Sequence, residues 1–585
     1  MKRSTWITVV LAVVGLSAIG DAAEPTACPA PVSGFVSPAA GEHPRLFFRK
    51  AELPAIKARA ATEDGKRMVA RLRFLLDGAN GDKMPELFDD TPKVLAQDHP
   101  KNNVHDAPLG KAFTLWHAAG YGMLYQLTGE KKYADLGRLC VEKMFDGQRD
   151  RDPVYGIYDP NGALRAGPSV GALAMAYDLN YDGWDEAFRL TVAKGIANFK
   201  GVKPNTSLAE LAVGSRHNPP KNHWGGQVGG AALALLAIKD DPGVDMAVIG
   251  PLLEKNKNAI RRQLDEGYSE FGFQSEGQGP GSITSDTAYV PALQAWRVAG
   301  GQDYLTPRPR ASWILMLKVH DLFTINGNPW LFNRNMGYGP SYGIGDYSET
   351  KERKGLSRGG QWAQGFGAIE EKYKGAALWC YNNILEPDPA KRTYDTVSFY
   401  PHRAVLALVN WPIGVKEQNP GEVIPKLVRD NNGYITTRNG WTGVNDCGVS
   451  AMGGPKGGPI MAWGLGIRVD WGSWGGSVSH WEDGKDGSFS VGNTKGDYYM
   501  AVDFSKKSGA DMLIAVAGKA RGKDQEVKGS DGATMLATSH KLGEKDVQIR
   551  TYARGKQPER TVTGDTLKVG GQSVKFDGEK FTLVW

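Results

Sequence analysis

One stretch of the chain, from Pro219 to Pro242, constrains the fold more than any other. Two prolines open it, and prolines suit the approach to a helix or its first turn but not its interior. Asn222, His223 and Trp224 follow, and an apolar run of small residues then extends to Ile238. Each glycine lowers helix propensity by roughly 1 kcal/mol relative to alanine, so we expect a closely packed neighbour wherever such a helix keeps glycines, here Gly225, Gly226, Gly229 and Gly230. We predict a buried helix whose first turn carries an amide, an imidazole and an indole at a mouth or cleft.

The chain around this helix has a helical pattern up to about residue 385. The connectors are short and carry Gly, Asp, Asn or Pro, which is typical of turns between antiparallel helical hairpins. We therefore predict a helical domain over residues 46–385, after a Pro-rich lead segment over residues 24–45. Apolar residues recur at spacings of three and four in Ala112–Leu127, Tyr133–Met144, Ser169–Leu179, Trp184–Phe199, Val244–Leu264, Thr284–Val298 and Tyr304–Leu322.

The sequence changes character after about Glu386. Short segments rich in Val, Ile, Thr and Trp follow one another, and Gly, Asn and Asp separate them at a spacing of roughly ten residues. This pattern is typical of an antiparallel β-sandwich. We predict such a domain over residues 386–585.

The N-terminus indicates export. Lys2 and Arg3 precede an apolar run from Trp6 to Ile19 and a small-residue cleavage site, which predicts a signal peptide over residues 1–23 and a periplasmic or secreted protein. No later apolar run reaches the roughly 20 residues that a membrane span needs. One disulfide is compatible with export, and its pairing stays open among the four cysteines Cys28, Cys140, Cys380 and Cys447.

The charge of the chain bears on its partners. The formal net charge is +6, and removing Lys2, Arg3 and Asp21 leaves 68 basic and 63 acidic residues, or +5. A mildly basic exported protein can attract an acidic polymer. We find no phosphate-binding loop, dinucleotide fingerprint, nucleophile elbow or dense basic stripe, and so we predict no nucleic-acid partner and no cofactor. The oligomeric state stays open.

Two motifs and the order of the domains carry a family resemblance. HPRLFFRKAELPAIKARA and KNHWGGQVGGAALALLAI, with helices before strands, resemble the heparinase II/III-like and alginate-lyase-like polysaccharide lyases. The resemblance implies an incomplete (α/α) toroid followed by an antiparallel β-sheet domain. It also implies β-elimination of a uronic-acid-containing polysaccharide. The family's usual site has an Asn and a His at the head of one toroid helix, a Tyr some fifty residues later, and often a His from the β-domain.

Asn222 and His223 match the first of these elements residue for residue. Tyr268 and Tyr289 flank the segment where the family has its tyrosine, and both are candidates. No His-x-His pair enters the β-domain, although this pattern forms the zinc site of some relatives. We therefore predict no metal site, and leave a structural divalent metal in the β-domain as an open alternative.

The predicted chemistry removes the proton on C5 of a uronate. Hydrogen-bond donors must neutralise the adjacent carboxylate so that the developing negative charge is stabilised. Asn222 can donate its amide at a helix start, where free N–H groups also attract anions. His223 can donate to the same carboxylate or act as the base. Tyr268 or Tyr289 can protonate the leaving oxygen, or serve as the base if ionised.

Further residues could bind the substrate. They precede or open the helix, lie in the acidic and Gly-rich stretch after Tyr268 (Glu276), belong to the Gly-rich and Tyr-rich loop between Asn333 and Glu349, or are histidines from the second half of the chain. The alternative for each is an ordinary structural role as a cap, a packed ring or a connector. The candidates are Arg216, His217, Trp224, Glu276, Arg334, Tyr338, Tyr342, Tyr347, His402 and His480.

Two other functions compete with the lyase. Paired carboxylates could carry out glycoside hydrolysis, which also occurs on helical toroids; the candidates are Glu270, Glu276, Asp286 and Asp346. The third alternative is a carbohydrate-binding protein without catalytic activity.

Overall fold

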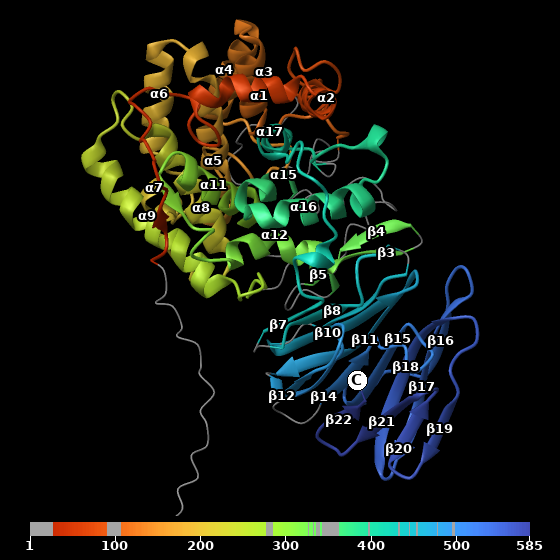
Figure 1. Cartoon of the computed structure of the whole chain (residues 1–585). Coiled ribbons are helices and arrows are strands. Elements are labelled where there is room, and N and C mark those ends of the chain that lie inside the picture. The colour runs from red at the N-terminus through yellow and green to blue at the C-terminus, as the bar shows by residue number, and fades with distance from the viewer. Residues whose placement is uncertain are drawn as a thin grey trace, which may run out of the picture.

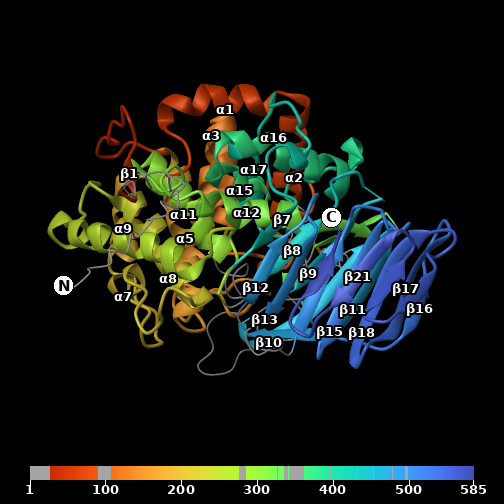
Figure 2. The same cartoon turned by 60° about the horizontal axis from the view of Figure 1, so that its bottom comes forward.

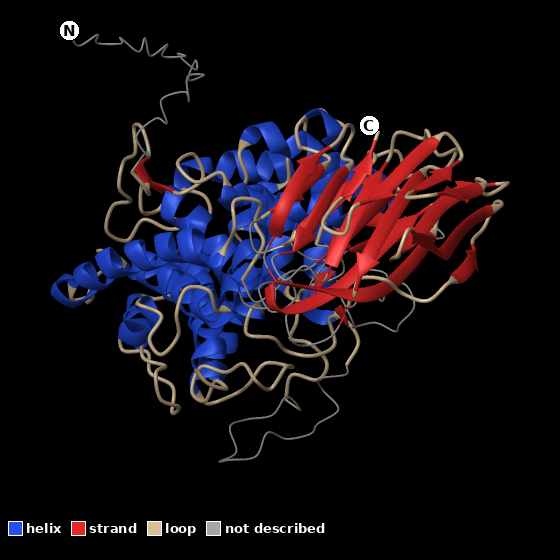
Figure 3. Cartoon of the chain, turned by 90° about the horizontal axis from the view of Figure 1, so that it is seen from below, coloured by secondary structure: helices blue, strands red, loops and turns tan. Residues whose placement is uncertain are grey.

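The computed structural model describes residues 27–89, 107–275, 285–325, 327–331, 333–334, 340–341, 362–395, 398–430, 433–443, 445–451, 454–476, 478–493 and 498–584. The predicted signal peptide lies outside these residues. Helices fill the N-terminal part of the chain and antiparallel sheets fill the C-terminal part (Figures 1 and 3). The structure thus confirms the predicted order of a helical domain before a β-domain.

Six helices form a ring at the centre of the helical domain. Each contacts the next along the chain, and the last contacts the first, which closes the toroid. The ring consists of α3 (His117–Thr128), α5 (Ala163–Asn180), α8 (Asn222–Ile238), α11 (Val290–Val298), α15 (Trp362–Gly365) and α17 (Pro401–Asn410).

A second set of helices packs outside the ring. Most of them bury only part of their surface, whereas α5 and α8 are buried almost all round. An all-round apolar helix must lie inside, and an amphipathic helix can cover it. The outer helices are α2 (Glu63–Asp77), α4 (Lys131–Phe145), α6 (Glu186–Ala197), α9 (Met246–Gly267), α12 (Arg310–Asp321) and α16 (Glu371–Cys380), and the short helices α1 (Leu53–Ala60) and α7 (Leu208–Ala212) accompany them.

The glycines of α8 do have the close neighbours that the sequence predicts. A Cβ on Gly230 would lie 1.8 Å from the carbonyl oxygen of Gly167 in α5. A Cβ on Gly167 would in turn lie 2.1 Å from the carbonyl oxygen of Gly226. On another side of α8, a Cβ on Gly229 would lie 2.6 Å from backbone atoms of Tyr289, in the π-helical turn η4 (Ser285–Tyr289). Backbone-to-backbone packing on two sides therefore fixes the position of α8.

Buried polar contacts attach the lead segment to the ring. The imidazole of His43 lies with Nδ1 2.7 Å from Oδ1 of Asp178 in α5 and with Nε2 3.0 Å from Oδ2 of Asp241, just after α8. Arg45 donates from Nη2 to Oδ1 of Asp241 at 2.6 Å. These groups are all buried, so their charges are compensated by one another. The motif His-Pro-Arg thereby joins the C-terminal ends of α5 and α8.

The helical part extends beyond residue 385, where the sequence change suggested a boundary. Helix α17 runs from Pro401 to Asn410, contacts α2, α3 and α15, and closes the ring. The first strand of the large sheets, β7, begins only at Leu427. The prolines at 387 and 389 therefore mark a connector within the helical domain.

Three antiparallel sheets form the β-domain, stacked in three layers. The five-stranded sheet has the order β11-β10-β9-β8-β7, the seven-stranded sheet β12-β13-β14-β15-β18-β17-β16, and the four-stranded sheet β19-β20-β21-β22. One apolar core lies between the first two sheets, and another lies between the second and the third. Strands β13, β14 and β15 of the middle sheet are buried on both faces as a result. The strands are β7 (Leu427–Arg429), β8 (Ile435–Arg438), β9 (Cys447–Ala451), β10 (Gly454–Gly464), β11 (Ile467–Gly476), β12 (Val478–Asp483), β13 (Phe489–Asn493), β14 (Tyr498–Asp503), β15 (Met512–Gly518), β16 (Gln525–Lys528), β17 (Ala533–Leu542), β18 (Lys545–Arg554), β19 (Arg560–Thr563), β20 (Thr566–Val569), β21 (Gln572–Phe576) and β22 (Phe581–Leu583).

The five-stranded sheet is the layer that contacts the helical domain (Figure 2). In β8, Thr436 donates to Oδ1 of Asp321 at the end of α12 at 2.8 Å, and Arg438 donates to the carbonyl oxygen of Leu322 at 2.7 Å. The ring of Phe323, in the hairpin β3 (Leu322–Ile325) and β4 (Asn328–Leu331), stacks on Trp463 of β10 with centroids 4.7 Å apart. Polar and aromatic contacts together fix this sheet against the end of α12.

The four cysteines are free thiols, so the disulfide that the sequence left open is not formed. Cys140, Cys380 and Cys447 are buried, and Cys28 is half-buried. Within the described ranges, no helix combines the length and the apolar character that crossing a membrane requires.

Candidate functional site

The first turn of α8 holds the two residues on which the lyase prediction depends. Asn222 and His223 are the first two residues of the helix, after Lys221 in extended conformation, and both side chains are half-buried rather than enclosed. The first turn contains no acidic residue. The partial positive charge of this helix end is therefore not compensated from within the turn, and it favours a bound anion.

A second imidazole lies against His223. The ring centroids of His217 and His223 are 4.4 Å apart, with the ring planes tilted by 42°. His217 comes from the loop before α8 and is also half-buried. Two cations at this separation would repel by about 4 kcal/mol at an effective dielectric constant of about 20.

Gln227 connects the two histidines, and it is not among the site residues predicted from the sequence. Its Nε2 lies 2.9 Å from Nδ1 of His217 and 3.0 Å from the carbonyl oxygen of His223. Gln227 is fully buried and lies four residues after His223, so both share one face of α8. Two features of the sequence could have indicated Gln227: its spacing of four residues from His223, and its amide inside an otherwise apolar run.

Tyr268 lies on a tight turn that packs beside the start of α8. It directly follows α9 and pairs across the turn with Gln274, which donates from Nε2 to the carbonyl oxygen of Pro220 at 3.0 Å. A Cβ on Gly267 would lie 2.7 Å from the carbonyl oxygen of Pro219. The structure therefore places Tyr268 next to the segment that leads into Asn222 and His223.

The β-domain reaches the same turn through Tyr434. This buried residue precedes β8, donates its hydroxyl to the carbonyl oxygen of Gln274 at 3.2 Å, and packs its ring against Phe273 at 4.5 Å. Burial raises the pKa of Tyr434 well above its usual range. Its role is to attach the turn to the second domain as a hydrogen-bond donor.

Tyr289, the second tyrosine candidate, lies inside the protein core. Its side chain is fully buried, its hydroxyl donates to the carbonyl oxygen of Ile260 in α9 at 2.7 Å, and burial raises its pKa well above the usual value. Its ring stacks beside Tyr268 with centroids 6.3 Å apart. A hydroxyl held by a backbone carbonyl inside the core is poorly suited to proton transfer. Tyr268 is also buried, with 5% of the residue exposed, and it is the better candidate only because its turn adjoins the start of α8.

Trp224 belongs to the core rather than to a sugar-binding surface. Its indole Nε1 donates to the carbonyl oxygen of Ala259 in α9 at 3.1 Å, and the guanidinium of Arg262 lies 5.2 Å from the ring centroid. Only 5% of the residue is exposed. The substrate-binding role predicted for Trp224 therefore does not fit its position.

His402 lies in the first turn of α17, and not in the β-domain. It is fully buried and stacks on Trp116, next to α3, with centroids 4.9 Å apart. Burial and the neighbouring guanidinium of Arg403 hold the pKa of His402 well below its usual range. Among the described residues neither ring nitrogen has a hydrogen-bond partner. This neutral imidazole is thus closed off from solvent on a different helix from His223.

His480 lies on the far side of the middle sheet. It pairs with Gly492 in the ladder between β12 and β13, and Gly492 pairs with Tyr499, whose side chain belongs to the core against the four-stranded sheet. The ring of His480 lies 6.4 Å from that of Tyr499. This face points away from the five-stranded sheet and the helical domain, which contradicts a role for His480 at the mouth of the toroid.

Fewer contacts are known for the remaining candidates, and some of them lie outside the described residues. Arg216 is exposed, with a left-handed backbone φ of 71°, and Arg334 lies in the short strand β5 (Asn333–Arg334). Of the carboxylates proposed for a hydrolase, Glu270 is exposed on the turn after Tyr268, and Asp286 belongs to η4. The described parts of the chain contain no group of three or more His, Cys, Asp or Glu that could hold a metal ion. The residues that lie outside the described ranges are Glu276, Tyr338, Tyr342, Asp346 and Tyr347.

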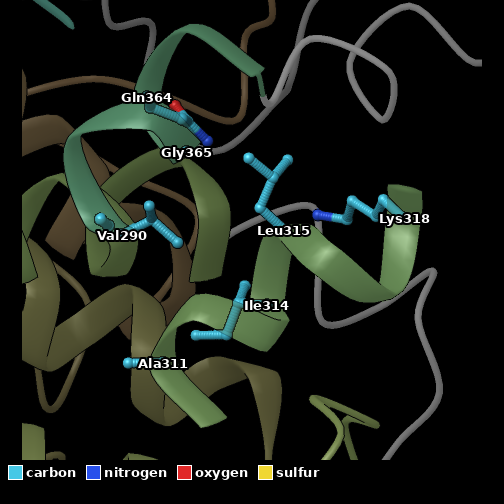
Figure 4. A pocket seen from close by; sticks show the side chains of 8 residues that line it. Val290, Ala311, Ile314, Leu315, Lys318, Gln364 and Gly365 are labelled. Carbon is cyan, nitrogen blue, oxygen red and sulfur yellow. The ribbon is translucent and has the colours of Figure 1, made fainter. Parts of the chain in front are cut away.

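A separate, mostly apolar cavity lies between α11, α12 and α15 (Figure 4). Lys318 and Gln364 are the polar residues in its wall. None of the residues that the sequence predicts for the site lines it.

Comparison with known proteins gives distant likenesses. No protein-family profile and no curated protein matches the chain. Among solved structures, it is similar to heparinase III (10% identity, 88% of this chain and 90% of the other, TM-score 0.44). It is also similar to heparan sulfate lyase HepC from Pedobacter heparinus (11%, 80% and 82%, TM-score 0.41) and to a Paenibacillus xanthan lyase (11%, 90% and 54%, TM-score 0.44).

Proposed function

We propose that this protein is an exported polysaccharide lyase that cleaves a uronic-acid-containing polysaccharide by β-elimination. The observation that supports this most is the arrangement at the start of α8. There a half-buried amide and imidazole share one helical turn, with a second imidazole at 4.4 Å and a tyrosine on the adjoining turn. The net charge of +6 for the whole chain also suits an acidic polymer.

In this proposal the uronate carboxylate binds at the helix start. Asn222 donates from its amide, and the partial positive charge of the helix start adds to the attraction. These donors stabilise the negative charge that develops on the carboxylate as C5 loses its proton. No acidic residue in the first turn opposes the bound anion.

His223 then accepts the C5 proton, and Tyr268 protonates the leaving oxygen as the C4–O bond breaks and a C4=C5 double bond forms. A neutral imidazole is a suitable base near neutral pH. His223 is half-buried rather than enclosed, which is compatible with access by a sugar. Arg216 is exposed next to His217, and we assign it an electrostatic role toward the acidic chain.

A screen of acidic polysaccharides tests the reaction class. A lyase produces an unsaturated uronate, so absorbance in the far ultraviolet should rise with each cleavage. New reducing ends without that absorbance would indicate the hydrolase instead. Binding without either product would indicate a carbohydrate-binding protein.

Two matched variants test the site. We expect His223→Ala and Tyr268→Phe each to lower kcat by at least about 100-fold, the lower end for acid–base groups. Tyr289→Phe removes the corresponding hydroxyl from the neighbouring buried ring and should leave kcat within about threefold of the wild type, because that hydroxyl serves only Ile260. Wild-type turnover by His223→Ala, with the fold intact by circular dichroism, would remove His223 from the mechanism.

A further inference from the structure

The hydrogen bonds of Gln227 determine which of its side-chain atoms is the nitrogen. One atom lies 3.0 Å from the carbonyl oxygen of His223 and 2.9 Å from Nδ1 of His217. A carbonyl oxygen can only accept a hydrogen bond, so the atom that contacts it must be the amide nitrogen. The reversed amide would set two oxygens against each other. The contacts themselves thus exclude the usual ambiguity between the two ends of a glutamine amide.

The same geometry determines the protonation state of His217. The amide nitrogen has two hydrogens, and one is used by the carbonyl oxygen of His223. The other points to Nδ1 of His217, which must therefore present its lone pair. The ring proton is then on Nε2. Protonating Nδ1 would set two N–H groups against each other, so the contact favours the neutral ring.

The surroundings indicate that this arrangement is maintained at a cost. Gln227 is fully buried, and its Oε1 has no hydrogen-bond partner in the described part of the chain. A buried carbonyl group without a partner is unfavourable. An apolar residue would fill this place in α8 without that cost, since the residues that follow it are Val, Gly and Ala. The amide therefore has a use other than the stability of the helix.

We propose that Gln227 is a positioning residue that holds His217 as the neutral Nε2–H form, so that His217 donates a hydrogen bond to the substrate carboxylate and His223 serves as the base. This inference rests on the proposed lyase function. The Nδ1 edge of His217 faces the buried Gln227, and the opposite edge, with Nε2, belongs to a half-buried side chain. An uncharged donor next to His223 also allows His223 to take up a proton without a second cation at 4.4 Å.

Nitrogen NMR of the histidine side chains tests the first half of this inference without any substrate. In full-length protein with ¹⁵N-labelled histidine, His217→Asn identifies the signals of His217 by their loss. We expect a pyridine-like Nδ1 and a pyrrole-like Nε2 in the wild type. Gln227→Glu replaces the donor with an acceptor and should move the proton to Nδ1. A pyrrole-like Nδ1 in the wild type, or the same tautomer in Gln227→Glu, would overturn the inference.

Steady-state kinetics on the polysaccharide identified by the screen test the second half. In Gln227→Glu the proton of His217 should be on Nδ1, so Nε2 presents its lone pair to the substrate carboxylate and no longer donates a hydrogen bond. We therefore expect kcat to fall about 100-fold, with a smaller change in KM. Gln227→Met, which tolerates either tautomer, should give an intermediate loss and serves if the glutamate variant does not fold. A changed tautomer with unchanged kcat would refute the donor role.

Gln263→Met is the matched control. Gln263 is also a fully buried glutamine, and its amide atoms have no hydrogen-bond partner among the described residues. Its replacement should alter neither the His217 signals nor kcat. If no polysaccharide is cleaved by the wild type, the lyase and the donor role fail together, whereas the NMR result still decides whether Gln227 sets the tautomer of His217.

Discussion

Acid should destabilise the helical domain through a histidine that the catalytic proposal does not use. His117 is the first residue of α3 and is fully buried. Its Nδ1 accepts a hydrogen bond from the backbone N–H of Thr114 at 2.9 Å, which requires an unprotonated nitrogen. Burial lowers the pKa of His117 from 6.5 to about 3. The unfolded chain therefore takes up a proton in a pH range where the folded protein does not.

The sign and the size follow from this difference. Below pH 6.5 the unfolded state binds more protons, so the free energy of unfolding decreases as the pH falls toward 3, and it is unaffected above 6.5. Each pH unit in this window costs about 1.4 kcal/mol for one proton. Between pH 6.5 and 4.5 His117 should thus account for about 3 kcal/mol.

The substitution His117→Asn isolates this contribution. Asparagine can still accept the bond from Thr114 but does not titrate. The variant should be less stable than the wild type at pH 7.5, because the ring volume is lost. The difference in unfolding free energy between the two proteins should shrink by about 3 kcal/mol at pH 4.5. Other titrating groups, including Asp150 with its pKa raised to about 8 by burial, are present in both proteins and cancel.

Urea unfolding followed by far-ultraviolet circular dichroism at several pH values measures this difference. The helical signal should be used, because the two domains need not unfold together. His540→Asn, at a partly exposed position in β17, is the control and should show a much smaller pH dependence. A gap between wild type and His117→Asn that stays constant from pH 7.5 to 4.5 would refute the reasoning.

Two further predictions concern the position of α8. Gly230→Ala should lower the free energy of unfolding by about 3 kcal/mol or more, since its Cβ would meet the Gly167 carbonyl oxygen at 1.8 Å. Gly250→Ala in α9 is its control. Nothing lies within 4 Å of a Cβ at this position, so the free energy of unfolding should rise by about 1 kcal/mol. Asp241→Asn should cost about 3–5 kcal/mol in urea unfolding, because it leaves the buried Arg45 without its carboxylate partner; a loss below about 1 kcal/mol would show that this contact does not hold the lead segment.

The sequence predicts α8 well because several signals agree there. The prolines, the apolar run and the Lys-Asp-Asp-Pro ending bracket the helix found from Asn222 to Ile238. The predicted helix boundaries are wrong near prolines, which ordinarily end or exclude a helix. The pattern suggested a helix from Ser169, but α5 begins at Ala163 and contains Pro168 in its second turn. The prolines near residue 387 similarly obscured α17, although its residues from Pro401 onward have helical spacing.

Site residues were harder to predict than helices, because chemistry alone does not give a residue its neighbours. Tyr268 and Tyr289 are equivalent in sequence, yet the hydroxyl of Tyr289 is bonded to a carbonyl of α9 inside the core, whereas Tyr268 lies on the turn beside the start of α8. His480 was separated from the toroid by the pairing of β12 with β13, which decides the face of the sheet. No local pattern gives that register. The contribution of Gln227 was equally hidden, because it depends on a loop residue ten positions earlier.

The arrangement of α8 explains how a helix poor in intrinsic propensity can position a site. Its glycines cost helix stability, but they allow α5 and η4 to approach at backbone distance. Gln227 lies between Gly226 and Gly229, so the same two turns that are packed most tightly also carry the amide that contacts both histidines. A larger residue at either glycine would displace that amide as well as the helix. Packing and hydrogen bonding at the start of α8 therefore depend on each other. The glycines allow the close approach of α5 and η4 that fixes the helix, and the fixed helix holds Gln227 against both histidines.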